Sequence, residues 1–180
     1  MGRLWEYHQD PQPYDVSEGV CLAMSYYVIQ RWLARLETTP TVLDAQMSRF
    51  CSMQRAAGGD VKLSGNGWLR MLARGDNLRA TRTYGSDNLR TAVERVASEV
   101  DALGVTRVGV TMGLHMAAGG HRITMLVDTE QDQGLFFDPN HGMYDISDGP
   151  PALYVEKDIS RWESVIIYGT PRNIGSLAAD

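Results

Sequence analysis

The chain has 180 residues, 43% of them hydrophobic and 22% charged, a composition typical of a soluble globular protein rather than a disordered one. Its 17 basic and 22 acidic side chains give a net charge of −5 without any run rich in Lys or Arg, which disfavours nucleic acid and anionic membranes as partners. Two cysteines are too few for a disulfide framework, and no run of about 18 apolar residues would cross a membrane.

Residues 1–18 are polar and contain prolines, which predicts an extended lead-in. They lack the apolar core of a signal peptide, so we expect a specialised secretion system to carry the chain if it leaves its cell. The length suits one core, and we expect residues 1–180 to form a single domain.

The first half of the chain is dominated by apolar residues at helical spacing. A helix from about residue 19 to 37 should end before Pro40, and Thr41 can cap the next one. The remaining elements predicted here are helices at 41–57, 65–76 and 86–103, with a possible strand at 78–84.

The second half is rich in short β-branched or aromatic segments separated by Gly, Asp and Asn turns. A segment that begins with two prolines, at 150–162, can be helical. The pattern predicts an α+β domain with four antiparallel strands, at 105–112, 121–130, 134–140 and 164–171.

Cys21 lies at the start of the first predicted helix, in the stretch "SEGVCLAMSYY". The free amides and dipole of a helix N-terminus stabilise a thiolate, the nucleophilic form of cysteine. Gly19 would allow a tight turn into the helix. A lone cysteine beside Leu and Val is more often a core residue, and we interpret Cys51 in that way.

Two later sites supply a base and a residue that can orient it. His121 follows two glycines and opens a predicted strand, unlike His8, His115 and His141. Asp138 ends the next strand, seventeen residues later, before a Pro-Asn-His-Gly turn. Adjacent antiparallel strands of this length bring both residues to one sheet edge, where a carboxylate can fix the imidazole tautomer.

At these three places, "GVCLAMSYY", "GGHRI" and "FFDPNHG", the chain resembles the papain-like cysteine peptidases of the bacterial effector type, the YopT/AvrPphB group. The resemblance implies that Cys21 attacks a peptide carbonyl, His121 exchanges protons and Asp138 orients His121. It also implies a papain-like fold, in which a helical part carrying the cysteine packs on the sheet carrying the other two residues.

The oxyanion hole departs from the family pattern, which places an amide side chain a few residues before the cysteine. Here "VSEGV" precedes Cys21, and Asp15 cannot donate when ionised. Gln12 is the nearest amide, while Ser17 or the Cys21 backbone alone are alternatives.

The resulting hypothesis is a cysteine endopeptidase, a toxin or effector that cleaves a protein in the cytosol of a target cell. Deamidation or transglutaminase-type acyl transfer would use the same triad and thioester. A non-catalytic binding module with a papain-like shell is a third alternative.

We expect a protein substrate, an immunity or inhibitor protein if the chain is the toxin end of a delivery system, and no cofactor. One sulfur, one imidazole and one carboxylate fall short of a structural zinc set, so we expect no metal.

Overall fold

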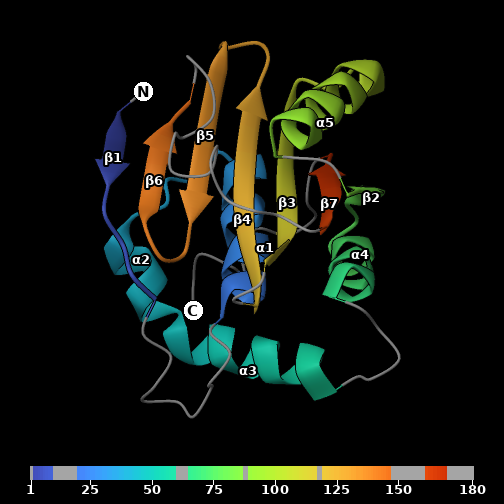
Figure 1. The fold of residues 1–180 in the computed structure, drawn as a ribbon. Helices are drawn as coiled ribbons and strands as arrows, with labels where there is room; N and C mark the ends of the chain where they lie inside the picture. Colours follow the sequence, from blue (N-terminus) through green and yellow to red (C-terminus); the bar gives the residue numbers. More distant parts are fainter. Residues whose placement is uncertain are drawn as a thin grey trace.

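The computed structural model describes residues 2–9, 20–59, 65–86, 89–116, 119–146 and 161–169. They form a mixed fold of helices and one antiparallel sheet (Figure 1). In chain order the elements are β1 (Arg3–Trp5), α1 (Cys21–Leu33), α2 (Pro40–Ala45), α3 (Met47–Gly59), α4 (Gly65–Gly75), β2 (Arg79–Gly85), α5 (Leu89–Leu103), β3 (Arg107–Met116), β4 (Gly119–Asp128), β5 (Gln133–Asp138), β6 (Gly142–Asp145) and β7 (Arg161–Tyr168).

The sheet has seven strands in the order β1-β6-β5-β4-β3-β7-β2, and each neighbouring pair is antiparallel. The prediction of a four-stranded sheet is therefore wrong. The four predicted strands correspond to β3, β4, β5 and β7, and β2 adds the possible strand at one edge. β1 and β6 at the other edge have three and four residues, too few to show a periodicity.

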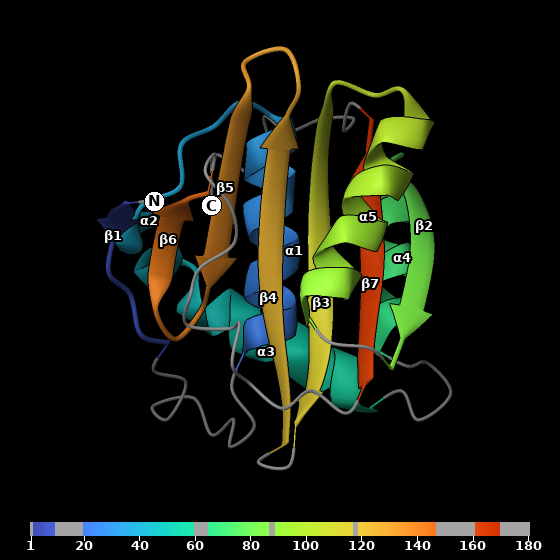
Figure 2. The same cartoon turned by 45° about the horizontal axis from the view of Figure 1, so that its top comes forward.

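Helices cover both faces of the sheet. Helices α1 to α4 pack on one face and α5 packs on the other (Figures 1 and 2). The division follows from the alternation of side chains along a strand, because Leu126 of β4 joins the α1 core while Ile123 and Met125 join the α5 core. The sheet is thus buried on both sides at its centre.

Helix α1 packs against the centre of the sheet (Figure 1). Every residue of α1 except Cys21 and Arg31 is buried. It approaches β3 so closely that a Cβ on Gly109 would lie 2.5 Å from the Ile29 side chain. The helix is shorter than predicted because Arg35 adopts a left-handed backbone with φ of 59°, which ends the helical turn.

The predicted helix at 41–57 is two helices, α2 and α3, separated at Gln46. Its cap is also different, since the Thr39 hydroxyl accepts a hydrogen bond from the Val42 N–H at 3.3 Å. Pro40 occupies the first helical turn, where its missing N–H costs nothing. Thr39, two residues before the predicted Thr41, is therefore the cap.

Helices α4 and α5 and strand β2 lie within three residues of their predicted bounds. Strand β4 begins two residues before His121, so the two glycines that precede His121 belong to the strand. The predicted helix at 150–162 lies outside the described residues, except for its last two, which begin β7.

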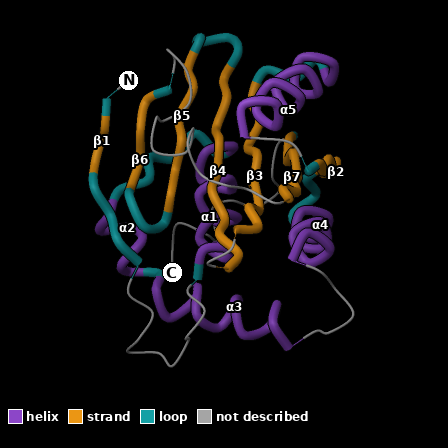
Figure 3. The backbone as a smooth tube through the Cα atoms, in the orientation of Figure 1, coloured by secondary structure: helices purple, strands orange, loops and turns teal. Residues whose placement is uncertain are grey.

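The N-terminal segment forms part of the fold along residues 2–9. Trp5 packs on Phe137, with ring centroids 5.9 Å apart, and the Tyr7 hydroxyl donates to Asp44 Oδ1 at 3.0 Å. Figure 3 shows the loop after β1 running beside α2. A Cβ on Gly142, whose φ is 101°, would lie 2.1 Å from the Trp5 carbonyl oxygen, so only glycine allows this approach. The rest of the predicted lead-in, at 10–18, lies outside the described residues.

Candidate active site

Cys21 is the first residue of α1, and its side chain is partly exposed. The preceding residue, Val20, provides no side-chain cap for the helix. The positive end of the helix dipole therefore acts on the sulfur of Cys21, where it stabilises negative charge.

His121 and Asp138 come from neighbouring strands. The register pairs Thr124 with Phe137, so the next residue of β5, Asp138, lies opposite Ile123. His121, two residues before Ile123, is therefore the diagonal neighbour of Asp138 on the same face. The His121 Nε2 and Asp138 Oδ1 atoms are 2.9 Å apart. The other ring nitrogen, Nδ1, is left to interact with Cys21, whose hydrogen bond and charge both act on the ring. The structure brings the three predicted residues together.

Asp138 is fully buried at the end of β5. Its Oδ1 atom also accepts a hydrogen bond from the Asn140 N–H at 2.7 Å, which ties it to the following turn. Within the described residues, Oδ2 has no hydrogen-bond partner. A buried carboxylate with so few hydrogen bonds is stabilised by a cationic neighbour. His121 is in contact with Asp138 and can be that neighbour.

The charges around His121 determine its protonation. Burial lowers its pKa, but hydrogen bonds to Asp138 and Cys21 and the negative charges of both outweigh the burial and raise the pKa to about 9. The ring is therefore protonated at neutral pH. The imidazolium thus lies between the Asp138 carboxyl group and the Cys21 side chain.

Arg122 adds a second positive charge near Cys21. Its side chain is partly buried and donates to the Thr111 hydroxyl. A Cβ on Gly113 would lie 2.9 Å from Arg122 Nη2, so the glycine leaves the space for the guanidinium. Burial lowers the pKa of Arg122 to about 10, while the charges of Cys21 and Glu163 act in the opposite direction. The guanidinium stays charged at neutral pH.

Gln9 connects the two halves of the site, and sequence reasoning missed it. Its Oε1 atom accepts from the Val20 N–H at 2.7 Å, just before α1, and its Nε2 donates to Asn140 Oδ1 at 2.8 Å. The Gln9 N–H also donates to the Pro139 carbonyl at 2.9 Å. The residue lies twelve positions before Cys21, outside the short window in which an oxyanion amide is expected.

The remaining predicted residues have other positions. Gln12 and Ser17 lie outside the described residues, as does Gly19. Cys51 is fully buried in the α1 core, as predicted, and is not in a disulfide. Among the competing histidines, His115 contacts Arg161, with His115 Nε2 and Arg161 Nη2 3.2 Å apart.

In the described parts of the chain, no three His, Cys, Asp or Glu side chains are grouped so that they could hold a metal ion. None of the helices within the described ranges is both long and apolar enough to span a bilayer.

Comparisons with known proteins give a structural match. No protein-family model and no curated protein matches the sequence. The fold is similar to the crystal structure of the Pseudomonas avirulence protein AvrPphB, with a TM-score of 0.57 and 13% sequence identity over 89% of this chain and all of that one. The helices and antiparallel sheet of this chain thus form a fold of the AvrPphB type, in agreement with the fold that the sequence resemblance implied.

The raised pKa of His121 can be tested by NMR. We expect the imidazole of the native protein to lose its proton near pH 9. In Asp138→Asn the negative charge that favours the imidazolium is absent, so the pKa should fall by about one unit or more. Asp101→Asn, an exposed substitution on α5, should leave the titration unchanged. An imidazole that titrates near 6.5 in the native protein would contradict the ion pair.

Proposed function

We propose that the chain is an effector-type cysteine endopeptidase with Cys21 as nucleophile, His121 as proton carrier and Asp138 as the residue that orients His121. The observation that carries the proposal is the position of one imidazole between a buried carboxylate and a thiol at a helix N-terminus. The fold match supports the effector part of the proposal, because the neighbour is an avirulence protein.

The proposed reaction follows from these positions. The Cys21 thiolate attacks the carbonyl carbon of the scissile peptide and forms a tetrahedral oxyanion. His121 then gives its proton to the leaving amine, the C–N bond breaks, and a thioester remains on Cys21. Neutral His121 next takes a proton from water, whose oxygen attacks the thioester carbonyl. The second tetrahedral intermediate then collapses, the C–S bond breaks, and the Cys21 thiolate leaves. Because His121 already holds the proton taken from water, release of the carboxylic acid restores the ion pair.

The oxyanion would be bound at the N-terminus of α1. Among the hydrogen bonds recorded for the described residues, none uses the Cys21 N–H, so we assign it as one donor. We assign the Gln9 amide as the second. Its Nε2 carries two hydrogens, of which Asn140 takes one, and its oxygen is fixed beside the helix start by Val20.

The substrate in this proposal is a protein of a target cell, reached through a specialised secretion system. The likeness to an avirulence protein supports delivery into a host. The net charge of −5 suits a basic segment around the cleaved bond. An inhibitor or immunity protein would be a further partner if the producing cell is itself sensitive.

The peptidase activity is tested by incubating the protein with an extract of target cells and mapping peptide termini by mass spectrometry. We expect new termini that are absent with Cys21→Ala, whereas Cys51→Ala should retain them unless the loss of packing unfolds it. His121→Ala should reduce their rate of formation by about 10²–10⁴-fold, the usual contribution of general acid–base catalysis.

Other outcomes of the same experiment would overturn the peptidase proposal. Mass shifts of one unit on intact proteins would identify a deamidase, and amine adducts would identify acyl transfer. Termini that form equally with Cys21→Ala would come from another protease in the extract.

The role of Gln9 has its own test in the cleavage assay. Gln9→Ala should lower kcat by about 10²–10³-fold, the effect of losing one oxyanion donor, with little change in KM. The matched control is Gln54→Ala, because the Gln54 side chain accepts from the Ala23 N–H in the same helical turn, at 3.4 Å. A loss of kcat in Gln54→Ala but not in Gln9→Ala would give the role to Gln54.

A further inference from the structure

A pocket lies at the other end of α1 from Cys21. Its volume is about 640 Å³, and none of the residues that line it belongs to the candidate active site. Trp32, in the last turn of α1, forms part of its wall, so the length of the helix, roughly 18 Å, separates the pocket from Cys21. Its volume lies within the range of about 300–1,000 Å³ typical of small-molecule sites.

Much of the wall is apolar. Besides Trp32, the apolar lining residues come from β1, the segment after α1, and strands β4, β5 and β6: Leu4, Trp5, Leu36, Leu126, Leu135 and Met143. Leu4 is 53% exposed at the rim, one of three large hydrophobic side chains exposed in the described part of the chain. An apolar body in the pocket would cover this surface.

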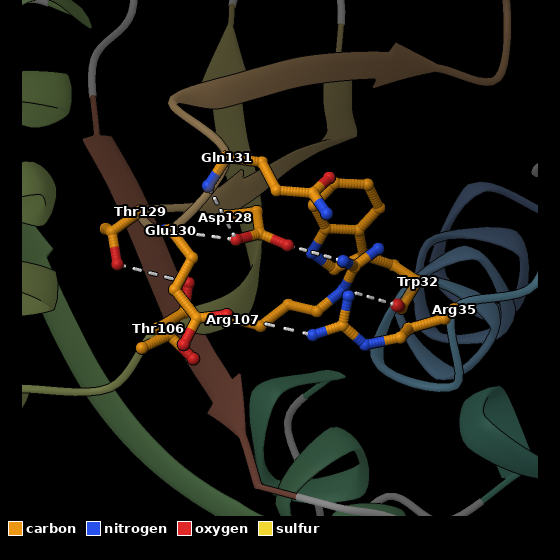
Figure 4. A network of polar contacts seen from close by, with 8 residues as sticks. All are labelled: Trp32, Arg35, Thr106, Arg107, Asp128, Thr129, Glu130 and Gln131. Carbon is orange, nitrogen blue, oxygen red and sulfur yellow. Dashed lines mark hydrogen bonds and ion pairs between the residues drawn. The ribbon is translucent and has the colours of Figure 1, made fainter.

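Arg107 forms a fixed cationic part of the wall (Figure 4). Its guanidinium lies 3.7 Å from the centroid of the Trp32 indole ring, and its Nε donates to the Trp32 carbonyl at 2.8 Å. Its Nη1 donates to Asp128 Oδ2 at 2.5 Å, and Asp128 is almost fully buried. Asp128 therefore holds Arg107 in place and offsets its charge.

Arg35 brings a second guanidinium to the same wall (Figure 4). Its ion pair with Glu130 is long, at 3.9 Å, and both side chains are more than half exposed, so this pair offsets little of the charge. Burial lowers the pKa of Arg107, Asp128 raises it, and the charge of Arg35 lowers it further. The two guanidinium groups thus repel each other.

The polar groups of the wall favour a ligand that accepts hydrogen bonds. The two arginines are donors only. The charged lining residues are these two arginines and the exposed Glu37. Because Asp128 offsets the charge of Arg107, Arg35 is the cation with the most charge left for a ligand. A carboxylate would accept from these donors and reduce the repulsion between the arginines.

We propose that this pocket binds a small amphiphilic carboxylate, with its aliphatic body against the apolar wall and its head group at Arg35 and Arg107. The site is independent of the peptidase proposal, because no residue of the candidate active site contributes to it. Binding should therefore persist in Cys21→Ala.

The probe for this site is decanoate, used below its micelle concentration. We expect saturable one-to-one binding by calorimetry and a shift of the Trp32 indole N–H signal, assigned with Trp32→Phe. Decyltrimethylammonium, which has the same chain and the opposite charge, should bind at least about tenfold more weakly, because it would face the two guanidinium groups.

Arg35→Gln tests the head group at an exposed position and should weaken decanoate binding by roughly tenfold, the effect of losing a charge-assisted hydrogen bond. Arg90→Gln, an exposed substitution on α5, is the matched control and should not change it. Leu4→Asp places a carboxylate at the apolar rim and should also weaken binding.

The following results would overturn the proposal. They are equal affinities in Arg35→Gln and Arg90→Gln, equal affinities for the anionic and cationic amphiphiles, and non-saturating uptake of decanoate. Binding of the peptide acetyl-Leu-Leu-Leu through its free carboxylate, without binding of decanoate, would also overturn it and identify a peptide site instead.

Discussion

The burial of α1 against the centre of the sheet is the constraint on which the rest of the structure depends. All but two of its residues are buried, and Gly109 permits the close contact between β3 and Ile29. Its first residue, Cys21, is partly exposed, and Arg31 is the other residue of the helix that is not buried. Because the helix cannot shift without losing most of the larger core, the thiol has a fixed position relative to β4.

The register of the sheet supplies the other half of the site. Pairing of β4 with β5 places His121 and Asp138 diagonally on one face, and the Asn140 N–H of the following turn donates to the same oxygen of Asp138. Gln9 then joins this turn to the start of α1. Three local features thus place the thiol, imidazole and carboxylate together, and a shift in any one of them would separate the imidazole from a partner.

The sequence predicted the parts of this arrangement that depend on local patterns. The helix start at Cys21 and the strand end at Asp138 both follow from periodicity and turn signals. The pattern could not reveal β1 and β6, because each is too short and is stabilised only by its neighbour. Gln9 was missed for a related reason, since its contacts are with residues eleven and more than a hundred positions away.

The central claim is that Cys21 is an activated nucleophile rather than a helix-start cysteine of ordinary reactivity. It is tested by the rate of Cys21 alkylation with iodoacetamide between pH 5 and 9, followed by peptide mass mapping with buried Cys51 as the internal comparison. The ion pair with His121 predicts fast alkylation well below pH 7 and a large loss of rate there in His121→Ala. A Cys21 that reacts no faster than a free thiol, with the same rate in His121→Ala, would contradict the account.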